Sequence, residues 1–118
     1  MKIDIATGKV TSYPMPSQDF GAYMAQVDKD HNVWMNYQNS GTVSKFDPKT
    51  EKWTVYSLPT QSFDTHEIGV MDHNGPTQIA VACIRNSKVA RLTVRTAADM
   101  SALKAELQQR SQQQVASR

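Results

Sequence analysis

The feature that most constrains this chain is an internal repeat in which similar residues recur 43 positions apart. Segment 4–16 aligns with segment 47–59, and after a gap of about three residues segment 43–46 aligns with 89–92. A period in the low forties with short strands is typical of a propeller blade of four antiparallel strands. The matched pairs are Asp4 and Asp47, Thr7 and Thr50, Lys9 and Lys52, Thr11 and Thr54, Tyr13 and Tyr56, Pro16 and Pro59, Phe20 and Phe63, and Val27 and Val70.

Within one period, short apolar or alternating segments are separated by turn-forming residues. The first copy predicts strands at 22–27, 33–36, 43–46 and 53–56, and the second copy predicts strands at 66–71, 77–82 and 88–94. Residues 2–13 resemble the third and fourth strands of a preceding blade. We therefore expect an all-β fold, a partial β-propeller of about two blades of four-stranded antiparallel meanders over residues 1–95.

The last part of the chain, residues 96–118, predicts a short C-terminal α-helix followed by a polar tail. Thr96 is a good N-cap, and Asp99 stands three residues later. Met100, Leu103 and Leu107 recur at helical spacing as a narrow apolar stripe. The run of glutamines after Leu107 is polar on every side, so we expect the helix to fray there.

Two blades do not close a ring, because propellers normally contain four to eight. The open strand edges left by two blades are an aggregation hazard. We therefore expect a truncated product, a fragment of a longer protein, or a subunit that closes a ring with copies of itself. Either the missing blades or self-association is needed to close the ring. The segment Val10–Tyr13 is a candidate for the outer strand that the last blade lacks.

Composition excludes some functions. With 13 basic and 11 acidic residues, scattered along the chain, we expect neither a nucleic-acid partner nor a membrane partner. The single cysteine, Cys83, cannot form an internal disulfide. The first residues do not read as a signal peptide. The compartment stays open: periplasmic or secreted if the full-length protein carries a signal peptide, and cytoplasmic otherwise.

Three segments resemble the streptogramin (virginiamycin B) lyase-like propellers. They are 28–35 (DKDHNVWM), similar to the family's D-x-x-G-N-x-W, 45–50 (KFDPKT), similar to K-F-D-P-x-T, and 56–60 (YSLPT), similar to Y-x-L-P-T. The resemblance covers about residues 3–95 and implies a C-terminal propeller fragment. His31 departs from it, because the family usually has glycine at that place in the turn. The family's type enzymes open a cyclic depsipeptide by elimination, so the resemblance implies a carbon–oxygen lyase that uses a magnesium ion and a histidine base near the central channel.

The candidate site residues lie where inner strands begin and on one loop. Tyr23 and His66 occupy the same repeat position, and Glu67 follows His66. We expect His66 to be the catalytic base, with its ring accessible from the channel, and Glu67 to be the carboxylate that binds magnesium. Adjacent strand residues point to opposite faces, so both can face the channel only if the strand has a bulge or an irregular entry. Tyr23, Arg85 and Asn86 are the expected ligand contacts.

Each of these assignments has a structural alternative. His66 and Glu67 can be a polar strand start that hydrogen-bonds to neighbouring blades. Trp34 and Trp53 are more simply blade-packing residues than stacking platforms for a ligand. Two functions therefore remain open: a lyase or hydrolase that acts on a small molecule or cyclic peptide, and a non-catalytic propeller that serves as a scaffold for protein or ligand binding. Only one His-Glu pair occurs at an inner strand start, which favours the scaffold for this chain alone.

Overall fold

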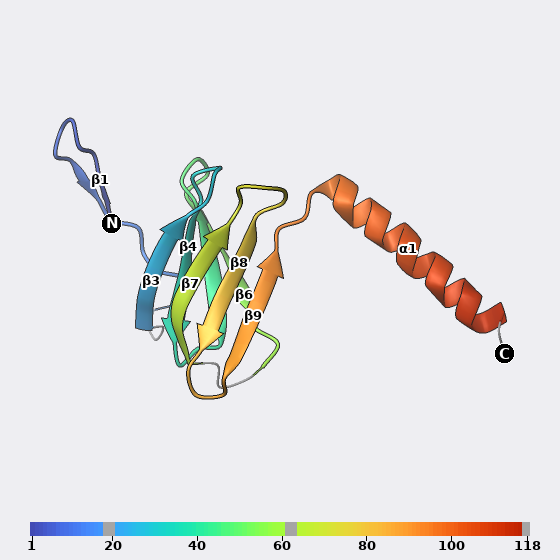
Figure 1. Ribbon diagram of the computed structural model, residues 1–118. Helices are drawn as coiled ribbons and strands as arrows, with labels where there is room; N and C mark the ends of the chain where they lie inside the picture. Colours follow the sequence, from blue (N-terminus) through green and yellow to red (C-terminus); the bar gives the residue numbers. More distant parts are fainter. Residues whose placement is uncertain (18–20, 61–63, 117–118) are drawn as a thin grey trace.

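The computed structural model describes residues 1–17, 21–60 and 64–116 (Figure 1). It is mostly β, with a two-stranded, a four-stranded and a three-stranded sheet, all antiparallel, and one C-terminal helix. The predicted all-β partial propeller is confirmed. The elements are β1 (Lys2–Ile3), β2 (Val10–Thr11), β3 (Gly21–Val27), β4 (Val33–Gln38), β5 (Thr42–Asp47), β6 (Lys52–Ser57), β7 (Thr65–Met71), β8 (Gln78–Cys83), β9 (Lys88–Thr93) and α1 (Ala97–Ala116).

The first blade is the meander β3-β4-β5-β6, and the second is β7-β8-β9. The inner strands β3 and β7 lie side by side and point in the same direction (Figure 1). The contacts between the blades include hydrogen bonds. The Val70 amide donates to the Gln26 side chain at 3.0 Å, and the Thr65 hydroxyl donates to the Tyr37 carbonyl at 2.8 Å. The two blades therefore pack as neighbours in a propeller do.

The hydrophobic core lies between the two sheets. Trp34 from the first blade and Ile79 and Val81 from the second are almost completely buried, and Tyr56 stacks on Trp34 with ring centroids 5.6 Å apart. Trp34 and Trp53 both lie on strands, as expected for packing residues. Alternation along β8 places every second side chain in the core. The core cluster consists of Trp34, Val43, Leu58, Ile68, Ile79, Val81, Cys83 and Ala90.

The turn between β3 and β4 is organised by the buried carboxylate of Asp28. It accepts hydrogen bonds from the amides of Asp30 and Asn32 at 3.0 and 2.9 Å and from the indole N–H of Trp34 at 2.8 Å. His31 has a φ of 66°, in the left-handed region that glycine adopts most easily. The departure from glycine noted in the sequence therefore falls on a position that favours glycine.

The helix is longer than expected. Thr96 and Asp99 form the predicted cap, because the Asp99 amide donates to the Thr96 hydroxyl at 3.2 Å and the Thr96 amide donates to the Asp99 carboxylate at 2.8 Å. The expected fraying after Leu107 was wrong, since α1 continues to Ala116. Glutamine and arginine are good helix formers, and Arg110 pairs with Glu106 one turn earlier at 2.8 Å. In the described ranges no helix is long and apolar enough to cross a membrane.

Candidate functional site

The inner strands both carry an irregularity near their start. In β3 the register shifts between Ala22 and Ala25, and in β7 it shifts between Thr65 and Glu67. Each shift places one extra residue on the inner strand, which is a β-bulge. From the sequence, His66 and Glu67 can both face the channel only if the strand has a bulge or an irregular entry. The structure contains a bulge at that place. Bulges re-aim side chains, so this is the part of each blade where the repeat can present unusual groups.

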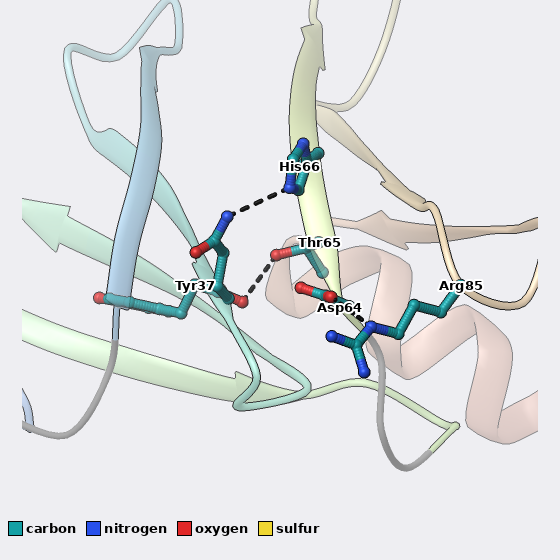
Figure 2. A network of polar contacts seen from close by, with 6 residues as sticks. Tyr37, Asp64, Thr65, His66 and Arg85 are labelled. Atoms are coloured by element: carbon teal, nitrogen blue, oxygen red, sulfur yellow. Dashed lines mark hydrogen bonds and ion pairs between the residues drawn. The ribbon is translucent and has the colours of Figure 1, made fainter.

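His66 lies between the two blades and is half-buried. Its ring stacks on the ring of Tyr23, with centroids 4.4 Å apart and planes inclined by 27°. The Nε2 atom of His66 lies 3.1 Å from the amide nitrogen of Gln38, which belongs to β4 of the first blade (Figure 2). The structure thus joins two of the predicted site residues, Tyr23 and His66, in one contact, and it adds Gln38.

The contact with Gln38 determines which nitrogen of His66 carries the proton. When Gln38 donates from its amide nitrogen, Nε2 of His66 accepts and the neutral ring keeps its proton on Nδ1. When the amide is turned by 180°, its oxygen accepts from Nε2–H and Nδ1 carries the lone pair. The described residues give Nδ1 no partner of its own. Gln38 therefore selects whether Nδ1 presents a donor or a base to a ligand.

A second polar group lies beside this one. Arg85, on the turn between β8 and β9, forms an ion pair with Asp64 at 2.7 Å, just before β7 begins (Figure 2). The Arg85 side chain is 73% exposed and the Asp64 side chain only 13%. The turn returns to the start of β7, because Cys83 pairs with Thr65 and the Ile84 amide donates to the Asp64 carbonyl at 3.2 Å. The predicted ligand contact Arg85 is thus brought to the end of the blades where β7 begins.

Buried polar atoms without partners also occur near the strand starts. Asn36 pairs its side-chain oxygen with the Met24 amide at the bulge, at 3.0 Å, whereas its amide nitrogen has no partner among the described residues. The side-chain oxygen of Asn86, the third predicted ligand contact, is likewise buried without a partner there. A buried polar group without a partner is unusual in a native protein. Asn86 therefore offers an acceptor that the described part of the chain does not use.

Glu67 is placed differently from His66. It is exposed and lines an open groove of about 540 Å³ with Gln26, Gly69, Ala80 and Ala82, on the face of the second blade. Across residues 1–17, 21–60 and 64–116, no three His, Cys, Asp or Glu side chains lie close enough together to hold a metal ion. Magnesium needs six oxygen ligands, several of them usually water. Glu67 supplies one carboxylate to this groove.

Three contributors to this region were missed in the sequence: Gln38, Asp64 and the backbone carbonyl of Tyr37. Each acts across the gap between blades or from a loop, and no local pattern marks such partners. Gln38 is the last residue of β4 and therefore lies opposite Gly21, at the start of β3. The pairing register of β3 with β4 was the one signal that could have placed Gln38 near the start of β3. Burial raises the pKa of the neighbouring Tyr37 phenol, which contacts the Ser44 hydroxyl, so Tyr37 stays neutral.

Comparison with known proteins supports the architecture. No protein-family model matches the chain, and no curated protein matches its sequence. Among solved structures, the virginiamycin B lyase from Staphylococcus aureus is similar, with a TM-score of 0.57 and 20% identity over 80% of this chain. The match covers 33% of the lyase chain, so this chain spans about a third of that protein's length. At this identity the likeness shows the fold alone: the chain has the fold of part of a β-propeller.

Proposed function

We propose that this chain supplies two blades of a propeller that binds a small molecule or cyclic peptide where β3 and β7 begin and acts on it as a lyase, with His66 as the general base. The observation that carries the proposal is the placement of the His66 ring. It is fixed by Tyr23 on one face and by Gln38 at Nε2, while Nδ1 has no partner in the described residues. In this proposal the Gln38 amide is turned so that its oxygen accepts from Nε2–H, which leaves the lone pair on Nδ1. A base needs both a fixed ring and a nitrogen that can reach the substrate.

The surrounding groups support binding of a polar substrate. The exposed Arg85 guanidinium can donate to a carbonyl or carboxylate while Asp64 holds it in place. In an elimination, His66 would remove a proton from the carbon next to the one that carries the ester oxygen. The electron pair would form a carbon–carbon double bond, and the oxygen would leave as carboxylate.

A magnesium ion enters this proposal only through the family resemblance. Glu67 would be its ligand from this chain, and the remaining ligands would have to come from water or from other blades. The scaffold remains the second candidate, because the described residues bring a single histidine to the strand starts. In that function the same groups bind a ligand without turning it over.

The test incubates the chain with virginiamycin B, with and without magnesium, and follows the antibiotic by liquid chromatography and mass spectrometry. Elimination opens the ring without a change in mass, whereas hydrolysis adds one water. We expect His66→Ala to reduce the rate of elimination by about a hundredfold or more, the effect of losing a general base. His73→Ala, which removes an exposed histidine from the β7–β8 turn, is the matched control and should leave the rate unchanged.

Binding and turnover are separated by titrating the labelled chain with virginiamycin B and recording the NMR signals of the His66 ring. Shifts of these signals without any ring opening would replace the lyase by the scaffold. Absence of both shifts and ring opening would overturn the proposed site.

A further inference from the structure

We propose that a second copy of this chain packs on the open face of the second blade and donates its β2 as the missing outer strand, so that copies join head to tail into a closed ring. The inference does not rest on the proposed function. It follows from three parts of the chain: the hairpin β1–β2, the segment that follows β2, and the open edge and face of the second blade. The 43-residue repeat shows how the first two would fit the third.

The first surface is the hairpin β1–β2, which copies the outer half of the first blade residue for residue. Lys2 pairs with Thr11 as Lys45 pairs with Thr54, and Ile3 pairs with Val10 as Phe46 pairs with Trp53. The connecting turns also match. The side chain of Asp4 accepts from the Thr7 hydroxyl, as that of Asp47 does from Thr50, and Gly8 and Glu51 are both left-handed. The strand β2 therefore has the geometry of the outer strand of a blade.

The segment after β2 already occupies the place of a preceding blade. Tyr13 packs on Phe46 with ring centroids 4.7 Å apart, and its hydroxyl donates to Glu51 at 3.2 Å. Met15 lines a groove of about 250 Å³ beside Phe46 and Trp53, on the face of the first blade away from the second. One repeat later, the residue that corresponds to Met15 is Leu58, which is buried in the core between the two blades. Segment 10–15 thus packs on the first blade as 53–58 packs toward the second.

The second blade has the matching gap. Its sheet ends at β9, whose outer edge has no partner strand among the described residues. The helix α1 does not fill this edge, because it extends away from the sheets (Figure 1). The adjoining face carries Gly69, Ala80 and Ala82, and Val89 of β9 is 71% exposed. A face of small residues next to an unpaired edge can accept a second sheet and an added strand.

A second copy of this chain is the occupant that these surfaces specify. In the repeat β9 corresponds to β1, so β9 of one copy can replace β1 as the partner of β2 from the next copy. The exchange replaces a two-residue strand, β1, by the six-residue strand β9. The register of the first blade then predicts that Arg91 lies opposite Thr11 and Val89 opposite Tyr13. Because a ring contains four to eight blades and this chain supplies two, we expect two to four copies to close the ring.

The first test is the mass in solution, measured by sedimentation equilibrium or multi-angle light scattering. We expect one discrete mass of two to four times the 13.2 kDa of the chain. Val89→Glu places a charge on the exposed face and should shift the mass to that of one chain, because an unpaired charge is costly in an interface. Leu107→Glu is the matched control, because Leu107 is 55% exposed on α1. Loss of assembly in Leu107→Glu but not in Val89→Glu would assign the contact to the helices and overturn the proposal.

The second test examines the register. Thr11→Cys and Arg91→Cys chains are mixed and oxidised, while the buried Cys83 stays in both. We expect a disulfide between the two variants, because directly opposed strand residues have the required separation. Lys9→Cys mixed with Arg91→Cys is the control, two residues away on the same side of the strand, and should cross-link far less. A single-chain mass, an open-ended polymer, or equal cross-linking at both positions would overturn the proposal.

Discussion

Replacing Asp28 by asparagine tests how the structure stabilises the repeat turn. One oxygen of the buried carboxylate accepts the indole N–H of Trp34 at 2.8 Å and the side-chain amide of Asn32 at 3.0 Å. In Asp28→Asn, an amide can keep the backbone contacts through its oxygen but places an NH₂ group against these two donors. The variant loses at least one charge-assisted hydrogen bond and leaves the buried Trp34 N–H without an acceptor. We expect the free energy of unfolding to fall by about 2–4 kcal/mol.

The assay is urea unfolding followed by tryptophan fluorescence, at a protein concentration where wild type and variant have the same mass, because self-association raises apparent stability. Trp34→Phe removes the donor and completes a double-mutant cycle. If the contact acts as described, the two substitutions together cost less than the sum of their separate effects. A loss below about 0.5 kcal/mol in Asp28→Asn, the level of an ordinary surface substitution, would refute the reasoning.

The same variant makes a prediction about pH. Burial alone would raise the pKa of Asp28, but the hydrogen bonds from Trp34, Asn32 and Asp30 outweigh it and hold the pKa below the ordinary value of 3.8. A carboxyl group with a lowered folded-state pKa stabilises the fold above its unfolded pKa and loses that contribution as pH falls through the folded pKa. The stability difference between wild type and Asp28→Asn should therefore be constant near neutral pH and shrink below pH 3.8. A difference that grows on acidification would contradict this assignment.

Two further predictions concern local backbone structure. His31→Gly should raise the free energy of unfolding by about 0.5–1 kcal/mol, because His31 has a φ of 66° and glycine adopts this conformation without strain; a decrease in the urea midpoint would contradict it. Thr96→Ala should destabilise α1 by about 1 kcal/mol, seen as lower helical circular dichroism, because it removes the N-cap of the helix. Ser101→Ala, inside the same helix, is the control, and an equal loss there would show that Thr96 does not act as a cap.

The repeat predicted the strands well, because a 43-residue period with turn residues at fixed offsets leaves little freedom in where each strand begins. Seven of the expected strands appear as β3 to β9, and the cap at Thr96 forms as predicted. The predicted end of the helix was wrong, because that prediction rested on where the amphipathic pattern stops and not on helix propensity. The glutamine-rich run after Leu107 has no apolar stripe, yet its residues are good helix formers and α1 includes them.

Of the candidate site, only the residues related by the repeat could be predicted from the sequence. Matching Tyr23 to His66 by the 43-residue offset placed two residues at equivalent bulges, and the structure brings their rings into contact. Gln38 could not be found in this way, because it is 28 residues from His66 and acts across the gap between blades. The ion pair between Asp64 and Arg85 depends on how the β8–β9 turn folds back on the start of β7. Contacts of this kind are set by packing, which a one-dimensional pattern does not record.

The positions where the two repeats within the chain differ are the candidates for a function. Asp47 and Asp4 organise the same turn, and β1–β2 repeats the register of β5–β6, so these shared features maintain the blade. At the bulges the copies diverge, because Tyr23 in the first blade corresponds to His66 in the second and Met24 corresponds to Glu67. In a fold built from repeated blades, a function can arise from substitutions in one blade that leave the shared fold unchanged. If copies of the chain close the ring and His66 faces the channel, both as proposed, the ring presents one His66–Tyr23 pair per chain to the channel.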